Sequence, residues 1–588
     1  MVEPESDLAA KATAWRDADP DPQTRAELDR LLADRDTAAL AERFEGSLAF
    51  GTAGIRAEIG AGPMRMNRLV VARVAAGLAR YITTSDPAAA TAGVAIGYDG
   101  RINSAVFAKD AARILSRAGV KVSMLPGPLP TPVLAYSVRR EQAAYGLMVT
   151  ASHNPRQYNG VKVYVRDGGQ LLPPQDEEIA AAIDAVDPLR LPAGWADGAF
   201  EFASADDAVS DYISSVAAGG PAPSSTPLTV VHTALHGVGD GTLRAVLSKA
   251  GWPAPIPVVA QQQPDGHFPT VPYPNPEEPG VLDLAQQTAE QAGADLVIAN
   301  DPDADRLAVM VPGPDGWHPL TGDELGALLG DATLTRLASG EPVANLGGRP
   351  AVAATTVVSG SLLRRLAEAA GVRCVTTLTG FKWIARTSGN DDALLYGYEQ
   401  ALGYAVRPDL VADKDGISAA LLVLQLATEE AARGRTLSDR LDDLAVTHGL
   451  HVTGLRTMKA DGPQGLDRLN EAVERVRKEP PRLLAGLPIT VTDLRDDAPG
   501  VVDLAGGHAE RSPGQPIPPS DVLIWHAGDD ARVMIRPSGT EPELKVYAEA
   551  VWHVRSRDGL AAARAGAAEQ VEQLMAATVA ALEGGRDS

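Results

Sequence analysis

The sequence TASHNP occupies residues 150–155, directly after the apolar run 145–149, and YNGVK follows at 158–162. The apolar run predicts a buried strand, and the proline and glycine after it predict that the chain leaves the strand as a loop. A serine on such a loop can project its hydroxyl from a rigid edge, which suits a nucleophile. A free serine hydroxyl is a weak nucleophile, however, and Ser152 has no G-x-S-x-G sequence around it. Its activating groups must therefore come from elsewhere in the chain.

Three aspartates at alternate positions are the first such groups. Asp301, Asp303 and Asp305 follow the apolar run 294–299. Carboxylate oxygens are the hard ligands that Mg²⁺ prefers, and the spacing differs from an EF-hand because no glycine follows at position six and no glutamate at position twelve. The alternative is a solvated acidic turn. If the loop curls, all three side chains can meet one ion.

A second group lies near the end of the chain, where RPSGTEP occupies residues 536–542. Its arginine fork, two hydroxyls and glycine-relaxed backbone suit a phosphate cradle, and the alternative is a capped β-turn. A serine, a divalent metal and a phosphate cradle together predict phosphoryl transfer through a phosphoserine.

These motifs, in this order, resemble those of the α-D-phosphohexomutase superfamily: T-A-S-H-N-P-x-x-Y-N-G-x-K-V-Y, D-P-D-A-D-R and R-P-S-G-T-E-P. FGTAGIR at 50–56 resembles the opening loop of its long-chain phosphoglucomutase branch, although alone it reads equally as a glycine-rich turn. The resemblance runs from about residue 15 to about residue 547. It implies an α/β fold with three related α/β domains with mixed sheets and a C-terminal α+β domain, arranged around a central active-site cleft.

Alternating strand and helix patterns predict four domains in a chain of this length. We expect an N-terminal α/β domain with the phosphoserine loop at 1–205, the metal-binding loop in 206–325, the sugar-recognition loop in 326–450, and the phosphate-binding loop in 451–588. No tandem repeat is visible in the sequence.

Three further local predictions follow from the pattern of residues. Charged residues and alanines at helical spacing predict two helices between residues 8 and 48, with a break at Asp-Pro-Asp-Pro 19–22. The Pro/Ser/Gly-rich stretch 219–227 predicts a linker. The Pro-rich segment 264–276 can be neither regular strand nor helix, and it resembles the superfamily's P-D-G-x-F-P segment.

The resemblance also implies roles for single residues. It assigns Ser152, Lys162 and His153 to catalysis, with Lys162 moving the hydroxyl proton and His153 orienting the serine rather than acting as a base. It assigns metal binding to Ser152, Asp301, Asp303 and Asp305. It assigns substrate binding to Arg56, Arg306, Thr379, Gly380, Lys382, Glu399, Lys414, Arg536, Ser538, Gly539 and Thr540.

Taken singly, each of these residues also has a plain structural interpretation. Ser152 alone reads as a helix cap, Lys162 as a surface lysine, and the residues of the sugar region as turns or charged surface. Ala401 departs from the superfamily, which commonly has a serine two residues after the glutamate that corresponds to Glu399. This lost hydroxyl bears on the sugar preference rather than on the reaction.

Composition limits the classes of partner. The net charge of −23 argues against a nucleic-acid or anionic-membrane surface, and it requires any site for an acidic substrate to be locally basic. The single cysteine, Cys374, cannot form an internal disulfide, which fits a reducing compartment. The acidic N-terminus resembles no signal peptide, and the apolar stretch 417–427 is too short to span a bilayer. We therefore expect a cytoplasmic protein with small sugar phosphates as partners, and the oligomeric state stays open.

The function that this resemblance implies is interconversion of glucose 1-phosphate and glucose 6-phosphate through a phosphoserine and a sugar 1,6-bisphosphate. Mg²⁺ would be the cofactor and glucose 1,6-bisphosphate the activator. Phosphomannomutase and phosphopentomutase activity are alternatives with the same chemistry. A phosphatase and a non-catalytic sugar-phosphate-binding paralogue are the more distant alternatives.

Overall fold

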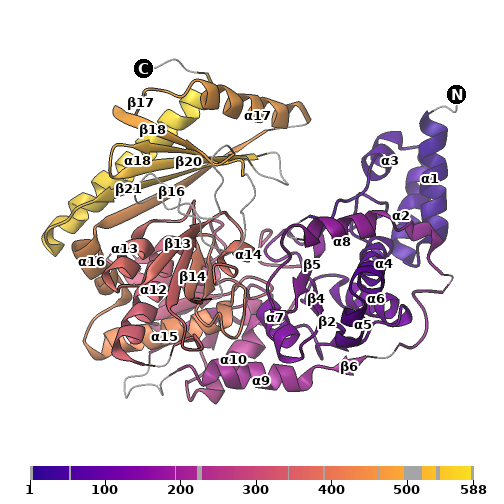
Figure 1. Ribbon diagram of the computed structural model, residues 1–588, viewed down its shortest axis with the longest axis horizontal. Helices are drawn as coiled ribbons and strands as arrows, with labels where there is room; N and C mark the ends of the chain where they lie inside the picture. Colours follow the sequence, from indigo (N-terminus) through magenta and orange to yellow (C-terminus); the bar gives the residue numbers. More distant parts are fainter. Residues whose placement is uncertain are drawn as a thin grey trace. The chain divides into compact units, whose positions relative to one another are not determined.

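The computed structural model describes residues 4–584 except for 52–53, 193, 201, 221–227, 315, 342, 389–390, 461–462, 496–519 and 538–542. Figure 1 shows its helices and strands. The chain divides into two compact units: Met1–Pro319 with Gly403–Gln425, and Leu320–Leu402 with Leu426–Ser588. Most of the predicted linker 219–227 lies outside the described residues. No helix of the described chain is long and apolar enough to span a membrane.

The N-terminal segment forms three helices where the sequence predicted two: α1 (Pro4–Ala18), α2 (Pro22–Ala33) and α3 (Thr37–Phe44). The prediction was wrong because the chain turns again after α2. Arg35 adopts a left-handed φ of 54°, and the Asp36 carboxylate accepts a hydrogen bond from the backbone N–H of Ala39 at 3.0 Å. An aspartate cap of this kind starts a new helix.

The first α/β domain contains one mixed sheet in the order β1-β5-β4-β2-β3-β6. β2, β3 and β4 are parallel, whereas β5 and β1 run antiparallel at one side. Its strands are β1 (Ile55–Glu58), β2 (Val94–Tyr98), β3 (Val122–Met124), β4 (Tyr145–Val149), β5 (Tyr158–Val165) and β6 (Ala203–Ser204). Its helices are α4 (Arg68–Ser85), α5 (Pro87–Ala92), α6 (Ser104–Arg117), α7 (Thr131–Arg140), α8 (Gln175–Asp184) and the short 3₁₀ helix η1 (Pro188–Arg190).

The second domain repeats this plan with the sheet order β11-β10-β9-β7-β8. Its strands are β7 (Val230–Thr233), β8 (Ile256–Pro257), β9 (Leu296–Ala299), β10 (Ala308–Gly313) and β11 (Gly316–Pro319). Its helices are α9 (Asp206–Ala217), α10 (Gly239–Lys249), η2 (Val259–Gln261) and α11 (Asp283–Ala292). The Pro-rich segment between η2 and α11 contains no regular element in the described chain, as predicted.

In the third domain, β12 pairs in parallel with β13 on one side and with β14 on the other. Its strands are β12 (Ala351–Thr356), β13 (Arg373–Thr377), β14 (Ala393–Glu399) and β15 (Gly403–Ala405). Its helices are α12 (Gly322–Ser339), α13 (Leu362–Ala369), α14 (Phe381–Ile384), α15 (Gly416–Ala432) and α16 (Leu437–His448).

The last domain is an antiparallel sheet in the order β16-β21-β20-β19-β18-β17, which confirms the predicted α+β class. Its strands are β16 (Leu450–Lys459), β17 (Leu483–Leu484), β18 (Leu487–Asp493), β19 (Leu523–Ala527), β20 (Ala531–Pro537) and β21 (Glu543–Trp552). Its helices are α17 (Pro463–Lys478), η3 (Arg557–Gly559) and α18 (Leu560–Leu582). Apolar residues of α17 and α18 join the sheet in one core.

The three α/β domains share one strand order. In each, the first strand of the parallel part of the sheet is central, with the second of these parallel strands on one side and the third on the other: β3-β2-β4, β8-β7-β9 and β13-β12-β14. Ser152 lies directly after β4, Asp301 directly after β9, and Glu399 at the end of β14. The predicted catalytic, metal and sugar residues therefore occupy the same topological position in their domains. Each lies at the carboxyl end of a parallel strand, beside the central strand where the strand order reverses direction. Open α/β sheets place their ligands at this position.

Candidate active site

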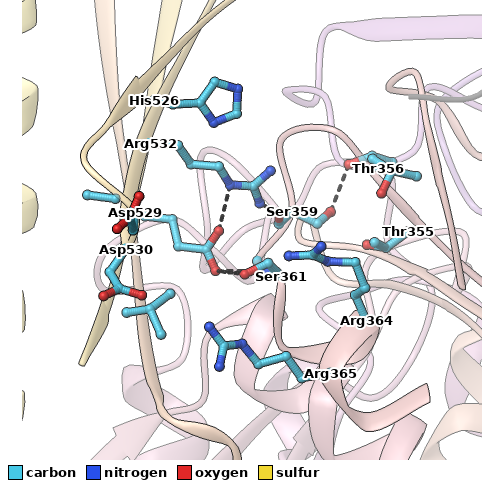
Figure 2. Close-up of a pocket in the computed structure, with 15 residues that line it drawn as sticks. Thr355, Thr356, Ser359, Ser361, Arg364, Arg365, His526, Asp529, Asp530 and Arg532 are labelled. Atoms are coloured by element: carbon cyan, nitrogen blue, oxygen red, sulfur yellow. Dashed lines mark hydrogen bonds and ion pairs between the residues drawn. The ribbon is translucent and has the colours of Figure 1, made fainter. Parts of the chain in front are cut away.

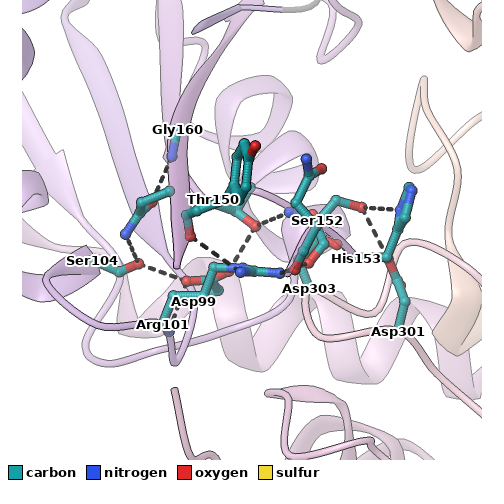
Figure 3. Close-up of polar contacts among 12 residues, drawn as sticks. Asp99, Arg101, Ser104, Thr150, Ser152, His153, Gly160, Asp301 and Asp303 are labelled. Atoms are coloured by element: carbon teal, nitrogen blue, oxygen red, sulfur yellow. Dashed lines mark hydrogen bonds and ion pairs between the residues drawn. The ribbon is translucent and has the colours of Figure 1, made fainter. Parts of the chain in front are cut away.

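Ser152 is buried, and its backbone has a left-handed φ of 51°. Its hydroxyl donates a hydrogen bond to Asp301 Oδ2 at 3.0 Å and lies 3.2 Å from Nδ1 of His153 (Figure 3). The structure thus brings the predicted nucleophile to the predicted metal loop, although 149 residues separate them in the sequence.

The three aspartates form one buried cluster. One carboxylate oxygen of each lies within 4.8 Å of the others. Burial first, and then the charges of Asp303 and Asp305, raise the pKa of Asp301 well above its usual range. The Oδ1 atoms of Asp303 and Asp305 are buried without a hydrogen-bond partner among the described residues. Buried carboxylate oxygens without partners, together with the serine hydroxyl beside Asp301, fit a divalent cation with oxygen ligands.

Two lysines approach the cluster. Lys162 lies on β5, and its Nζ is 2.8 Å from Asp303 Oδ2 and 3.1 Å from Asp305 Oδ2. Burial opposes ionisation of Asp303, but the charge and hydrogen bond of Lys162 prevail and lower the pKa of that carboxyl. Lys414, which the sequence assigned to sugar binding, has its Nζ 3.4 Å from Asp305 Oδ2. The structure therefore places Lys414 at the aspartates.

Two arginines, Arg56 and Arg306, lie near the loop of Ser152. Nη1 of Arg56, on β1, donates to the side-chain oxygen of Asn154 at 3.4 Å. The backbone N–H of Arg306 donates to Asp301 Oδ1 at 3.1 Å. Burial, with the charges of Arg306 and Arg56, lowers the pKa of His153 well below its usual range. A neutral imidazole next to Ser152 fits the orienting role that was predicted for His153.

The predicted sugar residues lie in the other unit. Thr379 and Gly380 form a half-buried turn between β13 and α14, and Gly380 has a φ of 110°, a backbone conformation that favours glycine. Nζ of Lys382 is 5.1 Å from the ring centroid of Trp383. Glu399 is the last residue of β14.

Gln400 fixes the loop that follows Glu399. Ser359 Oγ donates to Gln400 Oε1 at 3.0 Å and lies 3.2 Å from the backbone N–H of Gln400, which donates to it. A Cβ on Gly322 would lie only 1.7 Å from the Gln400 carbonyl oxygen, so the close approach of these backbones requires glycine there. Sequence reasoning missed this role of Gln400, because a half-buried amide gives no signal in one sequence.

Arg536 lies at the end of β20, while Ser538, Gly539 and Thr540 lie outside the described residues. Burial raises the pKa of the Tyr547 phenol, Lys545 and Arg536 oppose that rise, and Glu399 adds to it. Tyr547 is thus within electrostatic reach of both Glu399 and Arg536. Sequence reasoning missed Tyr547, which it counted only as part of a strand.

Two other residues near Ser152 and the aspartates were also missed. Thr131 begins α7, and its hydroxyl and backbone N–H both donate to Asp303, at 2.7 Å to Oδ2 and 2.9 Å to the carbonyl oxygen. Arg101 contacts the loop of Ser152. The signal for Arg101 was present as a charged D-G-R sequence directly after an apolar strand.

Comparison with known proteins decides the family. Four domain descriptions match in order: "Phosphoglucomutase/phosphomannomutase, alpha/beta/alpha domain I" at residues 47–190, domain II at 210–314, domain III at 321–447 and the C-terminal domain at 521–566. The chain belongs to the phosphoglucomutase/phosphomannomutase family. Its members are mutases, which are phosphotransferase isomerases, so the predicted reaction class and the four-domain fold are confirmed.

Relatives of this family differ in their named substrate. The chain is 39% identical to a "Probable phosphomannomutase" of Haemophilus influenzae over 83% of this chain and 93% of that protein. It is 33% identical to a "Probable phosphoribomutase" of Schizosaccharomyces pombe over 91% and 92% of the two chains. A phosphoglucomutase/phosphomannomutase family protein from Burkholderia thailandensis has the same fold, with a TM-score of 0.64, 18% identity and coverage of 92% and 98%. Further relatives at 31–34% identity are named phosphopentomutase or phosphoglucomutase.

Proposed function

We propose that this family member is a phosphoglucomutase that interconverts glucose 1-phosphate and glucose 6-phosphate through phosphorylated Ser152. One observation carries the proposal of a phosphoserine mechanism: the Ser152 hydroxyl lies 3.0 Å from an oxygen of the buried three-aspartate cluster. A structural serine has no need of such a neighbour, because a buried cluster of carboxylates is costly unless it serves a charge.

The proposed cycle has two transfers. In the first, the bond from phosphorus to Ser152 Oγ breaks and a bond to the free sugar hydroxyl forms. We assign Lys162 as the proton relay, which gives a proton to Ser152 Oγ as it takes the proton of that hydroxyl. In the second, the bond from the other phosphate to the sugar oxygen breaks, its phosphorus bonds to Ser152 Oγ, and the Oγ proton passes back through Lys162 to the sugar oxygen. Neutral His153, 3.2 Å from Ser152 Oγ, orients the serine, and Arg56 and Arg306 supply positive charge near it.

The aspartates are assigned to Mg²⁺. Asp301, Asp303 and Asp305, with Ser152 or its phosphate, would hold the ion, and Mg²⁺ supplies charge neutralisation to a phosphoryl group in transfer. The Oδ1 atoms of Asp303 and Asp305, which have no hydrogen-bond partner among the described residues, support this assignment.

The residues of the second unit are assigned to recognition of the sugar phosphate. Glu399 would accept hydrogen bonds from two sugar hydroxyls, with Thr379, Gly380 and Lys382 beside it. Arg536, with the loop Ser538–Gly539–Thr540, would hold the phosphate that is not transferred. A clamp of this kind accepts either phosphate of the bisphosphate, which lets one serine serve both ends of the sugar.

A phosphopentomutase is the second candidate. Relatives with that name match over 92% of this chain and about nine tenths of their own length. Ala401 stands where the superfamily commonly has serine, so one hydroxyl contact to the sugar is missing. A smaller sugar with fewer hydroxyls would lose less by its absence.

The test is a coupled assay with Mg²⁺ and a trace of glucose 1,6-bisphosphate as activator. Glucose 1-phosphate, mannose 1-phosphate and ribose 1-phosphate are offered at equal concentration to the wild type and to Ser152→Ala. We expect the highest kcat/KM on glucose 1-phosphate and its loss in the variant. A preference for ribose 1-phosphate would move the assignment to the second candidate. Release of inorganic phosphate without mutase activity would indicate a phosphatase, and inactivity of the wild type on all three sugars would leave a binding paralogue.

A further inference from the structure

The loop that carries Ser152 is fixed from behind by one fully buried arginine, Arg101, which follows β2. Its Nη2 donates to the carbonyl oxygens of Ser152 and Asn154, each at 2.5 Å, and its Nη1 donates to those of Pro155 and Tyr158 at 3.0 and 3.1 Å (Figure 3). A guanidinium presents five N–H donors in a rigid plane, which no other side chain does. One residue therefore ties together four carbonyl groups along the loop.

The loop needs such support because Ser152 is strained. A non-glycine residue at a φ of 51° costs roughly 1–2 kcal/mol, and it persists only where its surroundings fix it. The backbone N–H of Ser152 donates to Thr150 Oγ1 at 2.8 Å, and Thr150 Oγ1 donates to Asp99 Oδ2 at 2.7 Å. The same oxygen of Asp99 lies 3.4 Å from Nε of Arg101. Asp99 and Arg101 thus hold both the amide and the carbonyl of the strained serine.

The Pro-rich segment 264–276, which has no role in the proposed cycle, covers this arginine. The guanidinium carbon of Arg101 is 5.0 Å from the ring centroid of buried Phe268, within the range of a cation–π interaction. A Cβ on Gly266 would lie 2.6 Å from the backbone nitrogen of Ile102, so only glycine allows the segment to approach so closely. The P-D-G-x-F sequence therefore packs against the residues that support the serine loop.

We propose that Arg101 is a positioning residue for the phosphoryl transfer: with Phe268 packed against it, it sets the direction of Ser152 Oγ toward the aspartates. This proposal rests on the phosphoserine function proposed above. Arg101 acts through the loop backbone, so its loss affects the transfer step more than sugar binding.

The experiment compares Arg101→Lys with Arg68→Lys. The lysine keeps the charge opposite Asp99, but one ammonium group cannot donate to four carbonyls. Arg68 is the matched control, because it pairs through Nε and Nη2 with buried Asp110 at 2.6 and 2.9 Å in the same domain. Both variants lose a guanidinium from a carboxylate pair, and both are expected to lower Tm.

Two readouts separate positioning from general stability. Hydrogen exchange of peptides that cover residues 150–160 should rise in Arg101→Lys and stay at the wild-type level in Arg68→Lys. In the mutase assay, kcat of Arg101→Lys should fall by about 10- to 100-fold with KM within about twofold, whereas Arg68→Lys keeps its kcat. Phe268→Leu, which removes the ring and keeps the apolar contact, should change both readouts in the same direction by a smaller factor.

Each result decides the proposal. Unchanged exchange in the loop would overturn it whatever the activity, and raised exchange with an unchanged kcat would show that Arg101 is structural only. A wild-type protein without mutase activity would overturn the proposed function. The proposal that Arg101 positions Ser152 for phosphoryl transfer would then be overturned as well. The hydrogen-exchange data would still report whether Arg101 fixes the loop.

Discussion

Two buried clusters of charged residues, one in each unit, are compensated in opposite ways. In the first unit, the three aspartates crowd together, two of their oxygens have no hydrogen-bond partner among the described residues, and the pKa of Asp301 is raised. In the second unit, one carboxylate, Glu549, has partners on both oxygens. Figure 2 shows two residues of these contacts, Arg532 and Ser361. Oε2 of Glu549 accepts from Arg532 Nε at 2.7 Å, and its Oε1 accepts from the backbone N–H of Ser361 at 2.7 Å and lies 2.9 Å from His451 Nδ1.

The difference separates a functional cluster from a structural one. Burial opposes ionisation of Glu549, but Arg532 and His451 prevail and lower the pKa of its carboxyl. Its charge is satisfied within the protein, and it joins the start of α13 to β20 and β16. The aspartates are compensated only in part by Lys162 and Lys414. Their remaining negative charge is available to a ligand. The free-energy cost of burying that charge must be offset by stabilising interactions elsewhere in the fold.

The largest expected effect comes from removing one charge of the aspartate cluster. Asp301→Asn should lower kcat by a factor of roughly 10³ or more, because several kcal/mol of transition-state stabilisation are lost. It should at the same time raise Tm in the presence of EDTA, because it relieves repulsion among buried carboxylates. Mutase assays and thermal melts of one preparation check both effects. A lower Tm in EDTA would contradict the view that this cluster is under-compensated.

The same substitution at the other cluster should have the reverse outcome. Glu549→Gln leaves the partly buried Arg532 without its counter-charge, and breaking a buried pair costs about 3–5 kcal/mol of unfolding free energy. Because Glu549 contacts none of the proposed catalytic residues among the described chain, kcat at low temperature should stay within about threefold of the wild type. Urea titration and initial rates measure the two quantities. A stable variant with little activity would reverse the roles assigned to the two clusters.

Much of this site could be predicted from sequence because its motifs are local. Ser152, the three aspartates and Arg536 each lie in a short stretch whose residue types fit one chemistry. The structure brings Ser152 to Asp301, which the predicted shared metal site requires, and it also places Lys162 beside Asp303, a contact that was not predicted. The sugar-binding role of Lys414 stays a prediction: a lysine in a D-K-D-G sequence gives no sign of which carboxylate it will meet, and the fold places it beside Asp305.

The supporting residues were missed because they act across the sheet: the charged D-G-R sequence at Arg101 is visible, but one sequence does not show that it reaches the loop of Ser152. In each α/β domain the loop after the central strand (β2, β7 or β12) contacts and supports the loop after a neighbouring parallel strand (β4, β9 or β14). Arg101 donates to the carbonyl of Ser152, the backbone N–H of Val238 donates to the carbonyl of Pro302 at 2.9 Å, and Ser359 bonds Gln400. No tandem repeat is visible in the sequence, since the three domains use different residues for this support. The repeat exists in the strand order alone.

Asp323, in the second unit, is a carboxylate whose hydrogen bonds offset only part of the cost of burial. It therefore predicts an effect of pH on stability. Its Oδ1 accepts hydrogen bonds from the backbone N–H of Gly360 at 2.6 Å and from the Tyr398 hydroxyl at 3.0 Å. Burial outweighs these bonds and raises the pKa of Asp323 to about 6. Between about pH 4 and pH 6 the folded state therefore binds more protons than the unfolded state, so its stability falls as pH rises through this window, by about 3 kcal/mol in total.

Asp323→Asn tests this expectation, because the amide keeps the acceptor oxygen and cannot ionise. Urea melts from pH 4 to pH 7 should show a smaller decline in the variant than in the wild type, and the variant should be the more stable of the two at pH 7. Parallel curves for the two proteins would show that Asp323 does not titrate in this window.

The smallest expected effect is the response to Mg²⁺, and it distinguishes the two clusters most directly. An ion that binds only the folded state adds about 1.4 kcal/mol at ten times its Kd, so Mg²⁺ should raise Tm of the wild type by a few degrees relative to EDTA. Asp301→Asn should lose most of this rise, because a ligand charge is gone. Glu549→Gln should show the full Mg²⁺-dependent increase in Tm, starting from a lower Tm in EDTA. The substitution removes a charge that protein groups already neutralise, so it removes no ligand of the ion. An equal response of all three proteins would mean that Mg²⁺ binds elsewhere, and the aspartates would then have to be explained by Lys162 and Lys414 alone.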